Sequence, residues 1–370
     1  MKLKSMPALK ISDLDIHIPI IQGGMAVGIS LSGLASAVAS AGGVGVIGTA
    51  GIGMMEPDFN RNYKGANQRA LRKEIRKAKE ATDGIIGVNI MVALSDFAEM
   101  LNIAVQEEVD LVLMGAGLPL KGMELLIPVY HGEKKPKVVP IVSSARAAKL
   151  IFQHWEKCYQ HIPDAVVLEG PLAGGHLGFK REQIDNQDFT LERMLPETIS
   201  TLQPYADRYG KEIPVIVAGG IYSGKDIFHY LQLGARGVQM ATRFVATEEC
   251  DASLGFKQSY IDCKKDDLVI IDSPVGLPGR AIKNKFLEDV AKGNKKPFKC
   301  SWKCLKTCDF KSAPYCIASA LTHAQRGDFN SGFAFAGANA YRIEKIITVN
   351  ELISTLKNEY THTANKFYSN

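Results

Sequence analysis

Short apolar runs alternate with longer amphipathic segments from about residue 18 to about residue 240. The short runs are rich in valine and isoleucine, which is typical of parallel strands buried on both faces. They predict strands at residues 18–22, 44–48, 85–90, 111–115, 138–142, 165–169, 214–218 and 237–240. The segments between them repeat apolar residues at helical spacing and predict helices at residues 31–41, 68–81, 96–107, 144–155, 191–209 and 223–233.

Strand–helix units repeated in series predict an α/β protein with a (β/α)8 fold, the TIM barrel. A doubly wound open sheet also alternates strands with helices. The eight predicted strands favour the barrel, and so do the glycine and polar residues that follow many different strands. The dinucleotide fingerprint G-x-G-x-x-G does not occur between the first strand and its helix.

The regular alternation ends after Thr247. Residues 248–329 hold a proline- and glycine-rich stretch, a lysine-rich stretch and a group of cysteines. We interpret this segment as a smaller, mainly helical insert or second domain that covers the mouth of the barrel. Residues 1–247 and 330–370 would then form the barrel, with a closing helix at residues 346–356.

Composition limits the class of protein further. With 370 residues, 46% of them hydrophobic, the chain can bury a large core. The net charge of +5 gives no reason to expect a nucleic-acid partner. No apolar run is long enough to span a bilayer, and no signal-peptide core follows the first residues, so we expect a cytoplasmic protein without a membrane partner. The oligomeric state stays open, a homodimer included.

Glycine and small polar residues stand at the ends of several predicted strands. Gly23 and Gly24 follow the first strand, Asn89 lies in the third, Gly219 and Gly220 follow the seventh, and Thr242 follows the eighth. In a barrel these ends meet on the face that carries the active site. Backbone N–H groups after the seventh and eighth strands are a common phosphate site in such barrels. The sequence therefore predicts a phosphate-bearing cofactor at this face.

A glycine-rich turn at residues 170–178 follows the sixth predicted strand and carries His176. Glycine lets the backbone approach a flat ligand closely. A histidine beside such a ligand titrates near neutral pH and can carry a proton. A histidine that only caps the loop is the alternative.

Five stretches in barrel order resemble the nitronate monooxygenase family, formerly called 2-nitropropane dioxygenase. They are residues 19–25 (PIIQGGM), 87–91 (GVNIM), 173–178 (AGGHLG), 214–221 (PVIVAGGI) and 237–244 (GVQMATRF). The family includes the FMN-dependent enoyl-[acyl carrier protein] reductase II branch. The resemblance implies a flavoprotein with one non-covalent FMN, a catalytic His176, and flavin contacts from Gln22, Gly23, Gly24, Met25, Asn89, Ala173, Gly174, Gly175, Ala218, Gly219, Gly220, Met240, Ala241 and Thr242.

A late alanine–glycine pair, Ala336 and Gly337, resembles the pair that closes the flavin pocket in this family. The family often continues with glutamine there, whereas this chain has Ala338 and Asn339. The departure puts the late flavin contact in question.

The resemblance implies oxidation of small alkyl nitronates or nitroalkanes with O2 to carbonyl compounds and nitrite. His176 would deprotonate a neutral nitroalkane or stabilise its anion. The alternative is an NADH-dependent enoyl-[acyl carrier protein] reductase, whose acidic carrier protein would be attracted by basic residues between 280 and 299. Those residues also fit an ordinary solvated surface. An NADH:quinone reductase is a third reading, and residues 273–282 favour the monooxygenase side.

A hypothesis of another class concerns cysteines. Cys300, Cys304, Cys308 and Cys316 have the spacing C-x3-C-x3-C-x7-C. Four thiolates hold zinc or an iron–sulfur cluster in many proteins. On one helix, the first three would instead share a face and pack as core thiols. The spacing differs from common C-x2-C pairs, and no metal ligand is assigned from it.

Overall fold

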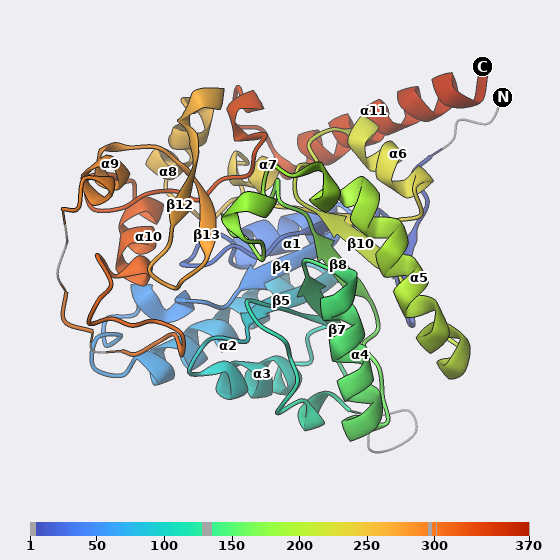
Figure 1. Ribbon diagram of the computed structural model, residues 1–370, viewed down its shortest axis with the longest axis horizontal. Coiled ribbons are helices and arrows are strands. Elements are labelled where there is room, and N and C mark those ends of the chain that lie inside the picture. The colour runs from blue at the N-terminus through green and yellow to red at the C-terminus, as the bar shows by residue number, and fades with distance from the viewer. Residues whose placement is uncertain (1–4, 128–134, 295–297, 301, 370) are drawn as a thin grey trace.

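The computed structural model describes residues 5–127, 135–294, 298–300 and 302–369. Its centre is a closed parallel barrel in the order β3-β4-β5-β6-β7-β8-β10-β11, with β11 pairing back onto β3 (Figure 1). The barrel strands are β3 (Ile20–Gln22), β4 (Val44–Gly48), β5 (Ile85–Met91), β6 (Leu111–Gly115), β7 (Lys137–Val142), β8 (Val166–Glu169), β10 (Val215–Ala218) and β11 (Gly237–Met240). Each corresponds to a predicted strand within a few residues, and the TIM barrel is confirmed.

Apolar residues fill both sides of the barrel wall. Ile21, Val46 and Leu113 belong to a cluster inside the barrel, whereas Ile47 and Val112 pack outward beneath the helices. This double burial is the reason that the strands read as continuous apolar runs rather than alternating ones. The hairpin of β1 (Leu9–Ile11) and β2 (Leu14–Ile16), which the sequence pattern did not predict, adds its own apolar side chains to the interior cluster.

Helices surround the barrel. They are α1 (Ser32–Ser40), α2 (Tyr63–Ala81), α3 (Phe97–Gln106), α4 (Ala145–Tyr159), α5 (Leu191–Tyr209), α6 (Gly224–Gln232) and α11 (Val349–Ser369). Side chains of Asn62, Ser144 and Ser223 cap α2, α4 and α6, which fixes where these helices begin. Between β6 and β7 the described residues form only the short turn η2 (Glu124–Leu126). No helix in the described part of the chain is long and apolar enough to cross a membrane.

The closing helix is longer than its prediction. The predicted helix covers residues 346–356, whereas α11 runs from Val349 to Ser369. It packs against α6 and α1, at the upper right of the view in Figure 1. Leu352, Leu356 and Tyr360 are buried along one face at helical spacing.

Residues 248–329 contain both helices and strands. The elements are α8 (Leu254–Ile261), η5 (Lys265–Asp267), β12 (Leu268–Asp272), β13 (Pro278–Ile282), α9 (Lys285–Ala291) and α10 (Ile317–Gln325). The β12–β13 hairpin was not predicted, and β9 (Gly175–His176) joins it as a third antiparallel strand. These elements gather at one side of the barrel in Figure 1. The division into two domains stays a prediction.

Candidate active site

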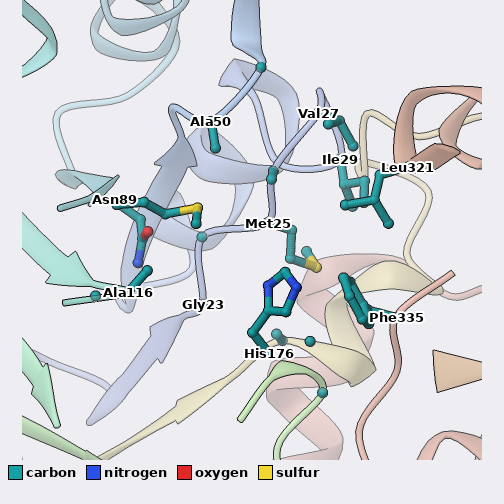
Figure 2. A pocket seen from close by; sticks show the side chains of 18 of the residues that line it. Gly23, Met25, Val27, Ile29, Ala50, Asn89, Ala116, His176, Leu321 and Phe335 are labelled. Atoms are coloured by element: carbon teal, nitrogen blue, oxygen red, sulfur yellow. The ribbon is translucent and has the colours of Figure 1, made fainter. Parts of the chain in front are cut away.

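One large pocket opens at the carboxyl ends of the barrel strands, with a cavity volume of about 360 Å³. Residues from the strand ends and from the segment 248–329 line it together. Figure 2 places Gly23, Met25 and Asn89 on the barrel side of this pocket and His176 beside Met25. His176 lines this pocket together with every expected flavin contact except Gln22. Ala336 and Gly337 line the pocket as well.

Gln22 has a different environment. Its side chain is fully buried, with Nε2 donating to the Gly23 carbonyl at 2.5 Å and Oε1 accepting from the Val46 N–H at 2.9 Å. Gln22 is not among the residues that line the pocket. It fastens the end of β3 to β4 and thereby fixes the position of Gly23.

Gly219 and Gly220 form a backbone cradle between β10 and α6. Their φ angles are +94° and +83°, a conformation that glycine adopts without strain. A Cβ atom at Gly219 would lie 2.8 Å from the Gly170 carbonyl oxygen. The cradle lies just before the N-terminus of α6, where backbone N–H groups and the helix dipole favour an anion. This geometry suits a phosphate group.

The late segment, residues 336–339, lies against the cradle and against the turn that carries His176. The Gly337 N–H donates to Thr242 Oγ1 at 3.1 Å, and a Cβ atom at Gly174 would meet the backbone of Ala336 at 2.5 Å. Asn339, where the family often has glutamine, donates from Nδ2 to the Gly220 carbonyl at 2.6 Å. Asn339 therefore supports the cradle from outside rather than lining the pocket.

Two buried polar atoms of the lining have no partner among the described residues. They are Oε1 of Gln239, on β11, and Nε1 of Trp302. A buried polar atom without a hydrogen bond costs about 1–3 kcal/mol, so a ligand in the pocket that bonds to these two atoms would recover that cost. One acceptor and one donor fit a flat heteroaromatic ligand that carries both N–H and carbonyl groups.

His176 stands on the two-residue strand β9. Its Nε2 lies 2.7 Å from Ser273 Oγ, and its ring packs edge-on against Phe335 with centroids 4.9 Å apart. Figure 2 shows the imidazole next to the side chains of Met25 and Phe335. Burial lowers the pKa of His176 to about 4, so the ring is neutral at neutral pH. A neutral ring whose Nε2 is held by Ser273 leaves Nδ1 for a ligand.

The low pKa of His176 predicts acid sensitivity. In the unfolded chain a histidine takes up its proton near pH 6.5, whereas the folded His176 stays neutral down to about pH 4. Stability linked to this residue is therefore complete above pH 6.5 and falls as the pH drops toward 4. We expect the wild type to lose about 2 kcal/mol relative to His176→Gln between pH 7 and pH 5. Urea unfolding of both proteins at the two pH values measures this difference.

Glutamine does not titrate, so the comparison isolates His176. Glu169 also lines the pocket, and burial raises its pKa to about 7, which gives a pH effect of opposite sign. That effect is present in both proteins and cancels in the difference. Parallel pH profiles for the two proteins would contradict the low pKa of His176 in the folded protein.

The sequence analysis did not assign three residues of this region. Glu169 is the last residue of β8 and lines the pocket. Its position directly before the glycine-rich turn is the feature of the sequence that could have indicated this role. Ser273 holds His176 across 97 residues of sequence. Arg280 donates to the carbonyls of Pro171, at 2.9 Å, and Ala173, at 3.3 Å, so it supports the turn that carries His176.

The expected basic surface between residues 280 and 299 does not include Arg280. The sequence predicts Arg280 as part of a solvated or carrier-attracting patch with the lysines between 280 and 299, but its side chain is buried. Burial lowers its pKa. Of that patch, Lys295 and Lys296 lie outside the described residues.

Comparison with known proteins gives a consistent result. The sequence matches the family model for nitronate monooxygenase over residues 8–115 and 101–359. A probable nitronate monooxygenase of Staphylococcus haemolyticus is 27% identical over 77% of this chain and 81% of its own length. The (3aS,4S,5R,7aS)-5-hydroxy-7a-methyl-1-oxo-octahydro-1H-indene-4-carboxyl-CoA dehydrogenase of Mycobacterium tuberculosis is 27% identical over 76% of this chain and 68% of its own.

Among solved structures, FabK from Thermotoga maritima is similar along almost the whole chain. It is 28% identical, with a TM-score of 0.73, and 96% of each chain is covered. The strand-end glycines, His176 and the closing alanine–glycine pair all lie within the matched residues. The chain belongs to the nitronate monooxygenase family.

Proposed function

We propose that the protein is an FMN-dependent oxidoreductase whose flavin occupies the large pocket. The glycine cradle at Gly219 and Gly220 would hold the phosphate, and Gly24 and Asn89 would lie along the ring system. Gln239 supports this assignment, because its Oε1, which has no partner among the residues that the structure describes, can accept a hydrogen bond from a ring N–H group. The bound flavin would supply the electron-accepting chemistry, and the protein would bind and orient it.

The activity we propose is oxidation of alkyl nitronates and nitroalkanes with O2, giving carbonyl compounds and nitrite. The observation that carries this proposal is the partly buried His176 at the pocket wall, whose Nε2 is held by Ser273 and whose ring is neutral at neutral pH. A neutral imidazole can take the acidic proton of a nitroalkane carbon, and an imidazolium cannot. Ser273 fixes the ring in one orientation through its 2.7 Å contact with Nε2.

The rest of the lining supports a hydrophobic substrate. Val27, Ile29, Leu321 and Phe335 lie on the side of His176 away from Asn89 (Figure 2). Apolar walls with a few placed polar groups are typical of small-molecule sites. The alkyl chain of the substrate would lie against these side chains, with its polar end at His176.

A second candidate is reduction of an enoyl thioester with NADH. The same apolar walls would accept an acyl chain, and one relative is named as the dehydrogenase of a carboxyl-CoA compound. In that reaction His176 would orient the thioester or pass it a proton. Acyl carrier protein or coenzyme A would then be the partner outside the pocket.

Anaerobic reduction of the purified protein distinguishes the two candidates. We expect an alkyl nitronate to bleach the flavin absorbance under nitrogen, and NADH to bleach it far more slowly. In air, the same nitronate should yield nitrite and a carbonyl compound in equal amounts. Rapid bleaching by NADH alone would favour the reductase. A protein that binds no FMN when the cofactor is added would contradict the proposed function as a whole.

A further inference from the structure

A second cavity lies beside the large pocket, with a volume of about 330 Å³. All four clustered cysteines, Cys300, Cys304, Cys308 and Cys316, line it. Their sulfurs are near enough to one another to interact electrostatically. This second cavity is distinct from the large pocket, although Cys304 lines both.

The cysteines do not lie on a common helix. Residues 300, 302–304 and 308 have no helical structure, and only Cys316 adjoins a helix, as the residue before α10. The interpretation of the first three cysteines as core thiols on one helix face is therefore wrong. A loop that turns four thiols toward one cavity is instead the arrangement of a ligand site.

The cysteine loop is fastened to the barrel. Leu305 forms an antiparallel bridge with Leu94, in the segment between β5 and α3. The Ser95 N–H donates to the Cys304 carbonyl at 3.0 Å, and the Lys306 N–H donates to the Ala93 carbonyl at 2.9 Å. These long-range bonds hold the middle of the loop against the barrel rim, so the thiols have a fixed frame.

N–H donors and positive charge lie around the sulfurs. Burial raises the pKa of the Cys304, Cys308 and Cys316 thiols, so a metal centre would bind them with loss of their protons. The Lys303 N–H donates to Cys300 Sγ at 3.4 Å. Cys316 is the N-cap residue of α10, where the helix dipole is positive. Lys303 and Lys306 also line the cavity. Positive charge and N–H donors of this kind stabilise sulfur-ligated centres.

Two kinds of four-cysteine centre differ in what they require. A zinc ion needs its four thiolates at about 2.3 Å from one point. Within the described residues, no group of three or more metal-ligating side chains is arranged to hold a single ion. An iron–sulfur cluster binds each cysteine to a different iron or pairs them on two irons, so it accepts sulfurs spread around a larger cavity.

The apolar walls of the second cavity are formed by Phe298, Phe310 and Ile317.

We propose that Cys300, Cys304, Cys308 and Cys316 bind an iron–sulfur cluster in this second cavity. The cluster would share the wall formed by Cys304, Leu305, Ile317 and Ala318 with the large pocket. A one-electron centre would then lie next to the proposed flavin site. This inference goes beyond the proposed function and does not depend on which substrate the large pocket takes.

Metal analysis of protein purified without oxygen tests the proposal. We expect iron and acid-labile sulfide in equal amounts, and an electron paramagnetic resonance signal of a reduced cluster after addition of dithionite. Cys308→Ser should lose the iron and the signal and keep its FMN. Cys158→Ser is the matched control, because Cys158 is exposed and lies outside both cavities, and it should keep iron and FMN.

The outcomes separate this proposal from the proposed function. Wild-type protein that binds FMN and contains zinc, or neither iron nor sulfide, would overturn the cluster alone. Iron retained in both Cys308→Ser and Cys304→Ser would overturn the ligand assignment. Protein with iron and sulfide but no affinity for FMN would leave the cluster standing and contradict the proposed function.

Discussion

Replacing His176 by glutamine is expected to lower the turnover of a neutral nitroalkane by about 10²- to 10⁴-fold, the usual contribution of a positioned general base. Glutamine keeps hydrogen-bonding groups but takes up no proton. The same variant should oxidise the pre-formed nitronate with a much smaller loss, because that substrate has already lost its proton. Nitrite release from the two substrate forms, measured at one pH, gives both numbers.

Ser273 provides a graded control for this experiment. Its hydroxyl contacts His176 Nε2 and does not line the pocket, so it acts as a positioning residue. Ser273→Ala should lower nitroalkane turnover less than His176→Gln does, mainly in kcat, and Ser273→Thr should restore part of the rate. Equal losses for neutral nitroalkane and nitronate in His176→Gln would show that the residue binds substrate and is not the base.

Replacing Gly219 by alanine is expected to lower the affinity for FMN by at least about tenfold. Alanine at a φ angle of +94° carries about 1–2 kcal/mol of strain. A cradle that relaxes to relieve this strain must regain it to hold the phosphate, so the cost appears in FMN affinity, where each 1.4 kcal/mol is a factor of about ten. The new Cβ would also lie 2.8 Å from the Gly170 carbonyl oxygen and 2.9 Å from the Ala173 nitrogen. Both neighbours are backbone atoms, so the cradle or the His176 turn must move. Fluorescence titration with FMN measures the affinity.

Gly210 is the matched control for backbone strain. It ends α5 with a φ angle of +60°, and a Cβ atom there would have no neighbour within 4 Å. Gly210→Ala should therefore lower the free energy of unfolding by a comparable amount and leave FMN affinity unchanged. Unchanged affinity in Gly219→Ala would remove the cradle from the cofactor site.

Much of the site was predictable because its residues follow strands. Gly23, Asn89, Gly219 and Thr242 lie at or near strand ends, and the ends of parallel strands in a barrel meet at one face. A correct strand prediction therefore gathers these residues without any knowledge of their contacts. Gln22 also lies at the end of a strand, but its side-chain amide bonds to neighbouring backbone groups and does not line the pocket.

The remaining features depend on contacts between distant segments. In the sequence, Arg280 is one more charge in a basic stretch. Only the fold shows that it is buried against carbonyls 107 and 109 residues away. The third strand beside the β12–β13 hairpin is β9, which has only two residues. A strand of that length shows no alternation of polar and apolar residues in the sequence. The spacing of the cysteines is compatible with thiols packed on one helix face. The structure shows instead a loop whose Leu305 forms a bridge with Leu94.

The sequence by itself determined the barrel, the face on which the site lies and the histidine that stands there. Strand formation, helix capping and glycine turns are local properties that a short stretch of chain encodes. The tertiary structure decided that Ser273 holds His176 and that four thiols line one cavity. It also decided that Oε1 of Gln239 and Nε1 of Trp302 have no hydrogen-bond partner within the described part of the chain. Burial, pKa and hydrogen-bond partners depend on which distant segments pack together, and no local pattern carries that information.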